Sequence, residues 1–363
     1  MKALVTGANG LIGANLVREL LAAGHEARAF VRETSDLRSL EGAPVEIVYG
    51  DALSVESITR AAEGCDLLFH AAAVFTYWGY SGDELETIAV RGAINALEAA
   101  HHAGVRRVVL TSSSVTLGSG IRPTPRDEDH QLQEKDAPAY LTAKARQERE
   151  AFQRAAELGM ELVAVCPTIT VGPHDYRLSP SNAVIVNYLA DPFKVTFPGG
   201  CNIVSARDVA RGHLLAATAG AAGERYALGS ENLDWATIHR AISEMCGVSG
   251  PHYFANHTSS YLAATAQELI SWLNRKPPAT TRAQAKMVGR YYWYRHDRAA
   301  ALGFTPEPAR QALASAIAWL AASPHISRQL RSTLRLAPEV YEARRRLEER
   351  EAVVMGGRPA NRG

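Results

Sequence analysis

Apolar runs alternate with helix-like patterns along the first two thirds of the chain. Residues 2–6 are small and β-branched and run into a glycine, which predicts a buried strand. Residues 14–23 carry leucines and a valine at helical spacing and stop at Gly24, as an amphipathic helix does. The same alternation predicts further strands at 26–31, 45–49, 67–71, 107–111 and 161–166, and long helices at 84–102 and 139–158. Crossovers of this length indicate a parallel sheet covered by helices on both faces.

Beyond Pro167 the alternation weakens, and loops rich in proline and glycine separate shorter helices predicted at 206–219 and 235–246. We therefore predict an α/β fold, a Rossmann-type doubly wound parallel sheet with a smaller, mixed C-terminal substrate lobe. The expected divisions are a dinucleotide-binding domain at 1–170, with segments around 201–230 returning to it, a substrate lobe at 171–325, and a charged helical extension with a flexible tail at 326–363. Arg and Glu residues at i,i+4 spacing within 341–351 predict that this extension is an exposed helix, solvated or in contact with another subunit.

The charge of the chain is balanced, with 39 Lys and Arg against 38 Asp and Glu and a formal net charge of +1. Nucleic-acid binding needs a concentrated positive field, so this balance argues against such a partner. The four cysteines are scattered and indicate neither a metal site nor a disulfide framework. No run of about 18 apolar residues and no secretory pattern is present. We therefore expect a cytoplasmic protein without a membrane partner, and a homodimer is left open.

A glycine-rich turn links the first predicted strand to the first predicted helix. From Thr6 to Gly13 the sequence is TGANGLIG, with the glycines spaced GxxGxxG rather than GxGxxG. Glycines here permit a tight turn and a close approach of the backbone to a pyrophosphate, while the helix N-terminus offers free N–H groups. The position of this turn between a strand and an amphipathic helix predicts a dinucleotide site.

The end of the second predicted strand distinguishes the two nicotinamide cofactors. An acidic residue there accepts hydrogen bonds from the ribose of NAD, whereas an arginine accommodates the 2′-phosphate of NADP. The strand ends at Val31 and Arg32, and Glu33 and Asp36 lie beyond it. An arginine makes charge-assisted hydrogen bonds to a phosphate, so we expect NADP to be preferred, with NAD as the alternative.

Tyr140 and Lys144 occupy positions i and i+4 at the start of a predicted helix and therefore share one face. A tyrosine that protonates an alkoxide needs a lowered pKa, and a nearby ammonium group favours the phenolate. The preceding predicted strand ends in Thr111, Ser112, Ser113 and Ser114, where a hydroxyl can hold a substrate carbonyl against the tyrosine. In this order, the glycine turn, the serine strand end and YxxxK predict a carbonyl-reducing site.

This arrangement resembles the extended short-chain dehydrogenases/reductases, and most closely their dihydroflavonol-4-reductase-like branch. The resemblance covers nearly the whole chain to about residue 322 and implies that Tyr140 is the acid/base, Lys144 orients the ribose and the tyrosine, and a serine polarises the carbonyl. Reductases of the branch match Ser113 and epimerases match Ser114, and we prefer Ser113. One departure is Ala89, which stands where the family often has an asparagine, so a relay through that side chain is in doubt.

The resemblance and the motifs together imply the following contacts. Expected cofactor contacts are Gly7, Asn9, Gly10, Leu11, Ile12, Gly13, Arg32, Asp51, Ala52, Ala71, Ala72, Ala73, Thr111, Ser112, Tyr140, Lys144, Pro167, Thr168 and Ile169. Aromatic residues after the 67–71 strand and in the following lobe suit a flat or apolar ligand. The expected substrate contacts are Phe75, Tyr77, Trp78 and Tyr176.

The leading interpretation is an NADP-preferring oxidoreductase that reduces the ketone or aldehyde of an aromatic or apolar small molecule. An NAD-dependent sugar-nucleotide epimerase or dehydratase is the alternative. A non-catalytic dinucleotide-binding regulator is a third, although relatives of that kind tend to lose the Tyr or the Lys, and this chain keeps both. An epimerase would need basic residues in the substrate lobe to meet a diphosphate, and the segment 172–205 offers only Arg177 and Lys194.

Overall fold

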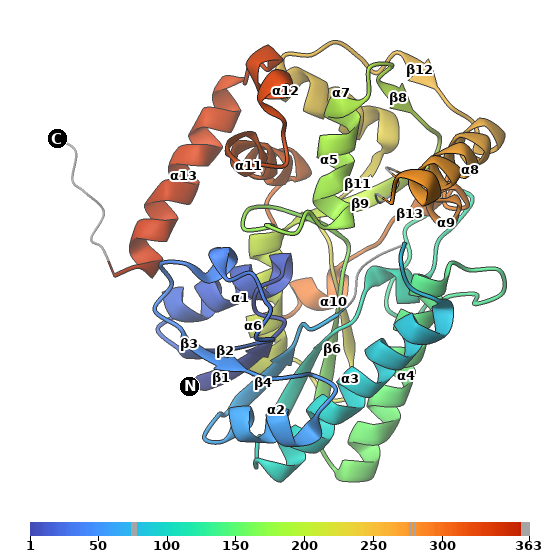
Figure 1. Cartoon of the computed structure of the whole chain (residues 1–363). Coiled ribbons are helices and arrows are strands. Elements are labelled where there is room, and N and C mark those ends of the chain that lie inside the picture. Colours follow the sequence, from blue (N-terminus) through green and yellow to red (C-terminus); the bar gives the residue numbers. More distant parts are fainter. Residues whose placement is uncertain (74–77, 276–277, 279, 357–363) are drawn as a thin grey trace.

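A parallel β-sheet forms the centre of the N-terminal part of the chain (Figure 1). The computed structural model describes residues 1–73, 78–275, 278 and 280–356. The strands lie in the order β10-β6-β5-β4-β1-β2-β3, and neighbours run parallel throughout. The bounds are β1 Lys2–Thr6, β2 Glu26–Val31, β3 Glu46–Tyr49, β4 Leu67–His70, β5 Arg107–Thr111, β6 Glu161–Pro167 and β10 Arg225–Leu228. The strand order reverses between β1 and β4, and open α/β sheets bind their ligands at such a switch point.

Helices cover both faces of this sheet because successive side chains of a strand point to opposite sides. In β1, Ala3 and Val5 pack in the core that includes residues of α1 and α6, whereas Leu4 packs in the opposite core with α2, α3 and α4. The buried faces of α3 and α4 are rich in alanine, which allows these two helices to approach closely. The bounds of these helices are α1 Leu11–Ala22, α2 Val55–Ala62, α3 Gly82–His102, α4 Ala139–Leu158 and α6 Ala206–Ala219.

A smaller lobe lies over the carboxyl ends of the strands (Figure 1). Its mixed sheet is organised by β9, which pairs in parallel with β7 and β13 and antiparallel with β11, while β8 pairs with β12. The strands are β7 Ile169–Val171, β8 Val195–Thr196, β9 Gly200–Ser205, β11 Glu231–Asp234, β12 Tyr253–Phe254 and β13 Tyr291–Tyr292. The helices of this part of the chain are α5 Pro180–Ala190, α7 Trp235–Cys246, α8 His257–Asn274, α9 Arg282–Ala285, α10 Asp297–Ala300, α11 Ala309–Ala322 and α12 Arg328–Thr333. A third apolar core joins α5, α7 and α11 to β9.

The predicted fold class is confirmed, and the strands at 26–31 and 107–111 and the helices at 139–158, 206–219 and 235–246 have the predicted bounds. The helices α2, α5 and α8 were not predicted. α2 is only eight residues long and begins at a local cap, in which the Ser54 side chain accepts a hydrogen bond from the Ser57 N–H. Such a short helix gives little periodicity from which to predict it.

The C-terminal helix α13, Pro338–Val354, is bound to the rest of the molecule rather than standing free in solvent. It packs along α11 and reaches α1, where Glu351 accepts a hydrogen bond from the Arg18 guanidinium at 2.7 Å. The interpretation of this helix as a solvated or subunit-contacting appendage is therefore wrong for its inner face. The predicted flexible tail at 357–363 lies outside the described residues. Within the described chain no helix combines the length and the apolar character needed to cross a bilayer.

Candidate active site

One large cavity, of about 1420 Å³, lies between the carboxyl ends of the sheet strands and the smaller lobe. Its near half is formed by the glycine turn and by the ends of β2, β4, β5 and β6, and its far half by α5, α7, α8, α9 and β13. All the predicted catalytic and cofactor residues line this cavity. The structure therefore brings together segments that lie as far apart in sequence as Gly7 and Ile169.

The glycine turn leaves room for a ligand against its backbone. Gly7 has a φ of +67°, and a Cβ there would lie 2.7 Å from the Ala72 backbone at the end of β4. A Cβ at Gly13 would lie 2.2 Å from the Gly7 carbonyl oxygen, so helix and turn can be this close only with glycine at position 13. α1 begins at Leu11 with no side chain capping its first N–H groups, which leaves them available to a phosphate. These features fit a dinucleotide pyrophosphate.

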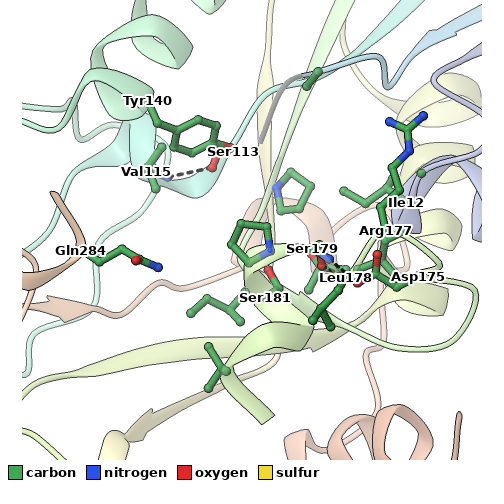
Figure 2. Close-up of a pocket in the computed structure, with 18 of the residues that line it drawn as sticks. Ile12, Ser113, Val115, Tyr140, Asp175, Arg177, Leu178, Ser179, Ser181 and Gln284 are labelled. Carbon is green, nitrogen blue, oxygen red and sulfur yellow. Dashed lines mark hydrogen bonds between the residues drawn. The ribbon is translucent and has the colours of Figure 1, made fainter. Parts of the chain in front are cut away.

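Two arginines line the cavity, one after β2 and one in the loop before α5. Arg32 directly follows β2 and lines the cavity, and its side chain makes no hydrogen bond or ion pair with the described residues. Arg177 reaches in from the loop before α5, and Figure 2 shows its side chain extended beside Ile12 in the first turn of α1. Asp36, one of the two acids that follow Arg32, is bound by Arg38, whose hydrogen bonds lower the pKa of Asp36 to about 2. The Arg32 guanidinium is thus unpaired among the described residues, at the strand end where the sequence analysis expects a 2′-phosphate.

Tyr140 and Ser113 face each other at the end of β5 (Figure 2). Ser113 caps the short helical turn Ser114–Leu117, and its Oγ accepts a hydrogen bond from the Val115 N–H at 3.4 Å. Burial raises the pKa of the Tyr140 phenol to about 12, and the interaction with the Ser113 side chain partly opposes this shift. Ser114 instead interacts with Tyr294. The two serines between which the sequence could not decide therefore have different partners, and Ser113 is the one beside Tyr140.

Lys144 lies one helical turn after Tyr140, but its ammonium group is held away from the phenol by two other acceptors. Nζ donates to the Thr111 carbonyl oxygen at 3.0 Å and to Gln147 Oε1 at 2.8 Å. Burial lowers the pKa of Lys144 to about 8, although the neighbouring Glu148 carboxylate has the opposite effect and raises this pKa. The expected lowering of the Tyr140 pKa by Lys144 is not found, because burial of the phenol dominates and the ammonium group is turned toward β5.

Gln147 is a further buried member of the site that the sequence analysis did not identify. Its Nε2 donates to the Ala89 carbonyl oxygen at 3.0 Å while its Oε1 accepts from Lys144. The side chain therefore joins Lys144 to the backbone of α3 at the position where the family often has an asparagine. Its place three residues after Lys144, one turn along the same helix, is the signal that could have revealed it.

The far half of the cavity has an apolar and aromatic wall. Tyr188 of α5 and His239 of α7 stack with ring centroids 4.2 Å apart, and Trp235 and Phe197 contact the same histidine ring. Polar atoms of this wall are bound within the protein, since the Tyr188 hydroxyl pairs with Ser243 at 2.7 Å. Burial lowers the pKa of His239 to about 4, so this ring is neutral at pH 7.

Of the residues predicted to contact the substrate, none that the structure describes is found in the cavity lining, unlike the residues predicted to contact the cofactor. Phe75 and Tyr77 lie outside the described residues, and Trp78 is not among the residues that line the cavity. Tyr176 is also absent from the lining, because its ring packs edge-on against Trp319, with centroids 5.3 Å apart. A second run of aromatic residues, at 291–294 in the smaller lobe, contributes Tyr292 and Tyr294 to the lining.

Comparison with known proteins places the chain in a family. The sequence model of the NAD dependent epimerase/dehydratase family matches residues 3–229. A putative dihydroflavonol 4-reductase of Synechocystis is 34% identical over 87% of this chain and 93% of that protein. The sterol demethylase protein B of Methylococcus capsulatus is 33% identical over 88% and 98%. The solved structure of gox2253 superposes with a TM-score of 0.79 at 31% identity, over 90% of this chain and 99% of that one. The chain therefore belongs to the NAD dependent epimerase/dehydratase family of extended short-chain dehydrogenases/reductases, in its dihydroflavonol-reductase-like branch, and is an NAD(P)-dependent oxidoreductase.

Proposed function

We propose that the protein reduces the ketone or aldehyde carbonyl of an apolar molecule, with NADPH preferred and Tyr140 as the proton donor. The observation that carries this proposal is the single cavity in which Tyr140 and Ser113 stand between a phosphate-binding glycine turn and an aromatic wall. A nicotinamide cofactor supplies the hydride when it is bound.

Each polar side chain of the site has one role in this reaction. Ser113 Oγ donates a hydrogen bond to the carbonyl oxygen and holds it beside the Tyr140 hydroxyl. Tyr140, whose pKa is raised to about 12, carries its proton at neutral pH and donates it to the oxygen as negative charge develops there. Lys144 lies one helical turn from Tyr140, where Gln147 and the Thr111 carbonyl hold its ammonium group, and its positive charge favours the phenolate that this transfer leaves.

The charges of the cavity support an apolar substrate over a sugar nucleotide. Among the described residues that line it, the cations are Arg32 after β2, Lys144 of α4 and Arg177 of the loop before α5, and none belongs to the aromatic wall. A sugar nucleotide would place its diphosphate against the aromatic wall, where no described lining cation could neutralise it. Two relatives are named for a dihydroflavonol and for a sterol, which agrees with a wall of this kind.

The test is oxidation of NADPH by the purified protein with a panel of aromatic and polycyclic ketones, with UDP-sugars and dTDP-sugars in parallel. A reductase consumes NADPH only when a ketone is present and exchanges its cofactor freely. An enzyme that isomerises a sugar nucleotide without net oxidation of added cofactor would contradict the proposal.

Arg32→Ala should weaken NADPH binding about tenfold or more, because hydrogen bonds to a charged group contribute roughly 1.5–3 kcal/mol each. NADH binding should stay unchanged, since that cofactor lacks the 2′-phosphate. Fluorescence titration of both cofactors measures the two affinities, and Arg60→Ala, an exposed arginine of α2 outside the cavity, is the control. Equal losses for NADPH and NADH would show that Arg32 does not select between them.

The rate of reduction should fall as the pH rises through about 8. Lys144, with its pKa lowered to about 8, loses its charge there, whereas Tyr140, with a pKa of about 12, keeps its proton. Gln147→Leu removes one acceptor of the Lys144 ammonium group, which lowers the pKa of Lys144 further and moves the midpoint of the fall down by about one pH unit. Single-turnover rates from pH 6 to 10 measure both midpoints. Coincident midpoints would indicate that another group titrates.

A further inference from the structure

Helix α8 turns its large apolar side chains toward solvent. Leu262, Leu269, Ile270, Trp272 and Leu273 are between 54% and 74% exposed, and we call them the outer face of α8. At 3.6 residues per turn they fall on one side of the helix, over roughly half of its circumference. Monomeric proteins rarely expose a contiguous apolar patch of this kind without a binding role.

The opposite side of α8 is small and polar, which reverses the usual arrangement of a surface helix. Ala264 and Ser271 are buried, while Ser260, Ala263 and Gln267 line the active-site cavity. Its main contacts with other helices and strands of the described chain are with α9. In Figure 1, α8 lies at the edge of the smaller lobe. The helix therefore separates the cavity from the outside and presents its apolar residues outward.

The apolar surface continues at the strand that leads into this helix. Tyr253 and Phe254 of β12 are exposed, four and three residues before α8 begins, and the ring of Phe193 lies edge-on to Tyr253 with centroids 6.2 Å apart. Phe193 is itself exposed and also lines the cavity. The far end of the cavity thus opens beside exposed aromatic side chains.

The segment around the outer face is basic, in contrast to the balanced charge of the whole chain. Residues 253–290 contain five Lys and Arg and a single acid, Glu268. Glu268 is bound to Arg282 at 2.6 Å, whereas Arg275, Lys286 and Arg290 are exposed. Exposed cations near an apolar helix face complement an anionic lipid surface. Each cation strengthens binding to that surface through its attraction to the headgroups.

We propose that α8 attaches the protein to the surface of an anionic lipid bilayer, with its outer face in the boundary between headgroups and acyl chains. The cavity then opens toward the phase in which an apolar substrate is dissolved. A second copy of the chain fits this face less well, because a twofold contact would bring the same basic side chains against each other. The expectation of no membrane partner was based on the absence of a spanning segment, which does not test attachment to a surface. The proposal goes beyond the proposed reaction, and its test requires no turnover.

The test uses the full chain and sucrose-loaded vesicles of phosphatidylcholine with about one third phosphatidylglycerol. We expect the protein to sediment with these vesicles and to bind phosphatidylcholine alone several-fold more weakly. Leu269→Ser/Trp272→Ser should weaken binding at least about tenfold, because these side chains lose their transfer into the lipid. The matched control, Tyr341→Ser/Val353→Ser on exposed positions of α13, should bind like the wild type.

A second measurement places the contact at α8. Vesicles made with brominated phosphatidylcholine should quench the fluorescence of Trp272, one of five tryptophans in the chain. Trp272→Phe keeps the apolar surface, so it should still bind but lose most of the quenching.

Three results would overturn the proposal: wild-type protein that does not sediment with anionic vesicles, equal binding by Leu269→Ser/Trp272→Ser, or wild-type dimers that this variant dissociates in analytical ultracentrifugation. The last result would assign the outer face to a second copy. A protein that binds vesicles but reduces no carbonyl would count against the proposed reaction alone.

Discussion

Replacing Tyr140 with phenylalanine should lower the turnover number at least about a hundredfold, the usual contribution of a general acid. The substitution removes the proton that the developing alkoxide needs and leaves a ring of nearly the same size. Affinity for NADPH should be retained, because the residues that would hold the phosphates, Arg32 and the glycine turn, are separate from the phenol. Single-turnover rates with saturating NADPH, measured beside equilibrium titration of the cofactor, separate the two effects.

Tyr188→Phe is the matched control for this experiment. This substitution also removes a phenol hydroxyl from a tyrosine that lines the cavity. The Tyr188 hydroxyl, however, is bound to Ser243 in the aromatic wall. Turnover of this variant should stay close to that of the wild type. If Tyr140→Phe also stayed within a few-fold of the wild type, the proton would have to come from another group and the proposed mechanism would be wrong.

The half of the candidate site that we assign to the cofactor could be predicted from the sequence because its residues occur at the ends of predicted strands. The carboxyl ends of parallel strands meet at one edge of the sheet, so the glycines after β1 and the serines after β5 come together whatever the loops do. The spacing of Tyr140 and Lys144 on one helix face is equally local. The cavity contains all of these residues, as expected.

The substrate half could not be predicted in the same way, since its residues have no common local pattern. Tyr188, His239 and Tyr292 meet only after α5, α7 and β13 have packed. Closeness in sequence to a site residue does not show that an aromatic side chain lines the cavity. Tyr176 is a predicted substrate contact, but its ring packs on Trp319.

Burial is the other quantity that the sequence does not contain. The spacing of Tyr140 and Lys144 predicted an ammonium group that lowers the pKa of the phenol, whereas burial of the phenol raises it to about 12. The direction of this pKa shift depends on how deeply the Tyr140 phenol is buried and on the Thr111 carbonyl, which binds Lys144 Nζ. Both follow from how α4 packs against β5, which is a tertiary property.

The second large effect that we expect is a loss of stability when a buried ion pair next to residues 112–116 is broken. Glu148 of α4 accepts hydrogen bonds from the Ser112 hydroxyl at 2.5 Å and from the Thr116 hydroxyl at 3.2 Å. Its other oxygen accepts from the Arg225 guanidinium at 2.8 Å, and both side chains are largely buried. This pair connects α4 and β10 to the segment that holds Ser113, so its loss affects the part of the chain on which the proposed mechanism depends.

Arg225→Met should lower the free energy of unfolding by about 3 kcal/mol or more, because it leaves the Glu148 charge buried without a partner. Urea unfolding followed by circular dichroism measures this change. Arg149→Met makes the same substitution in an exposed pair with Glu134, at 3.0 Å, and should cost less than about 1 kcal/mol. Adding Glu148→Gln to Arg225→Met removes the stranded charge and keeps acceptors for Ser112 and Thr116, so the double variant should recover a large part of the loss. A double variant no more stable than Arg225→Met would show that lost packing, and not the buried carboxylate, is responsible.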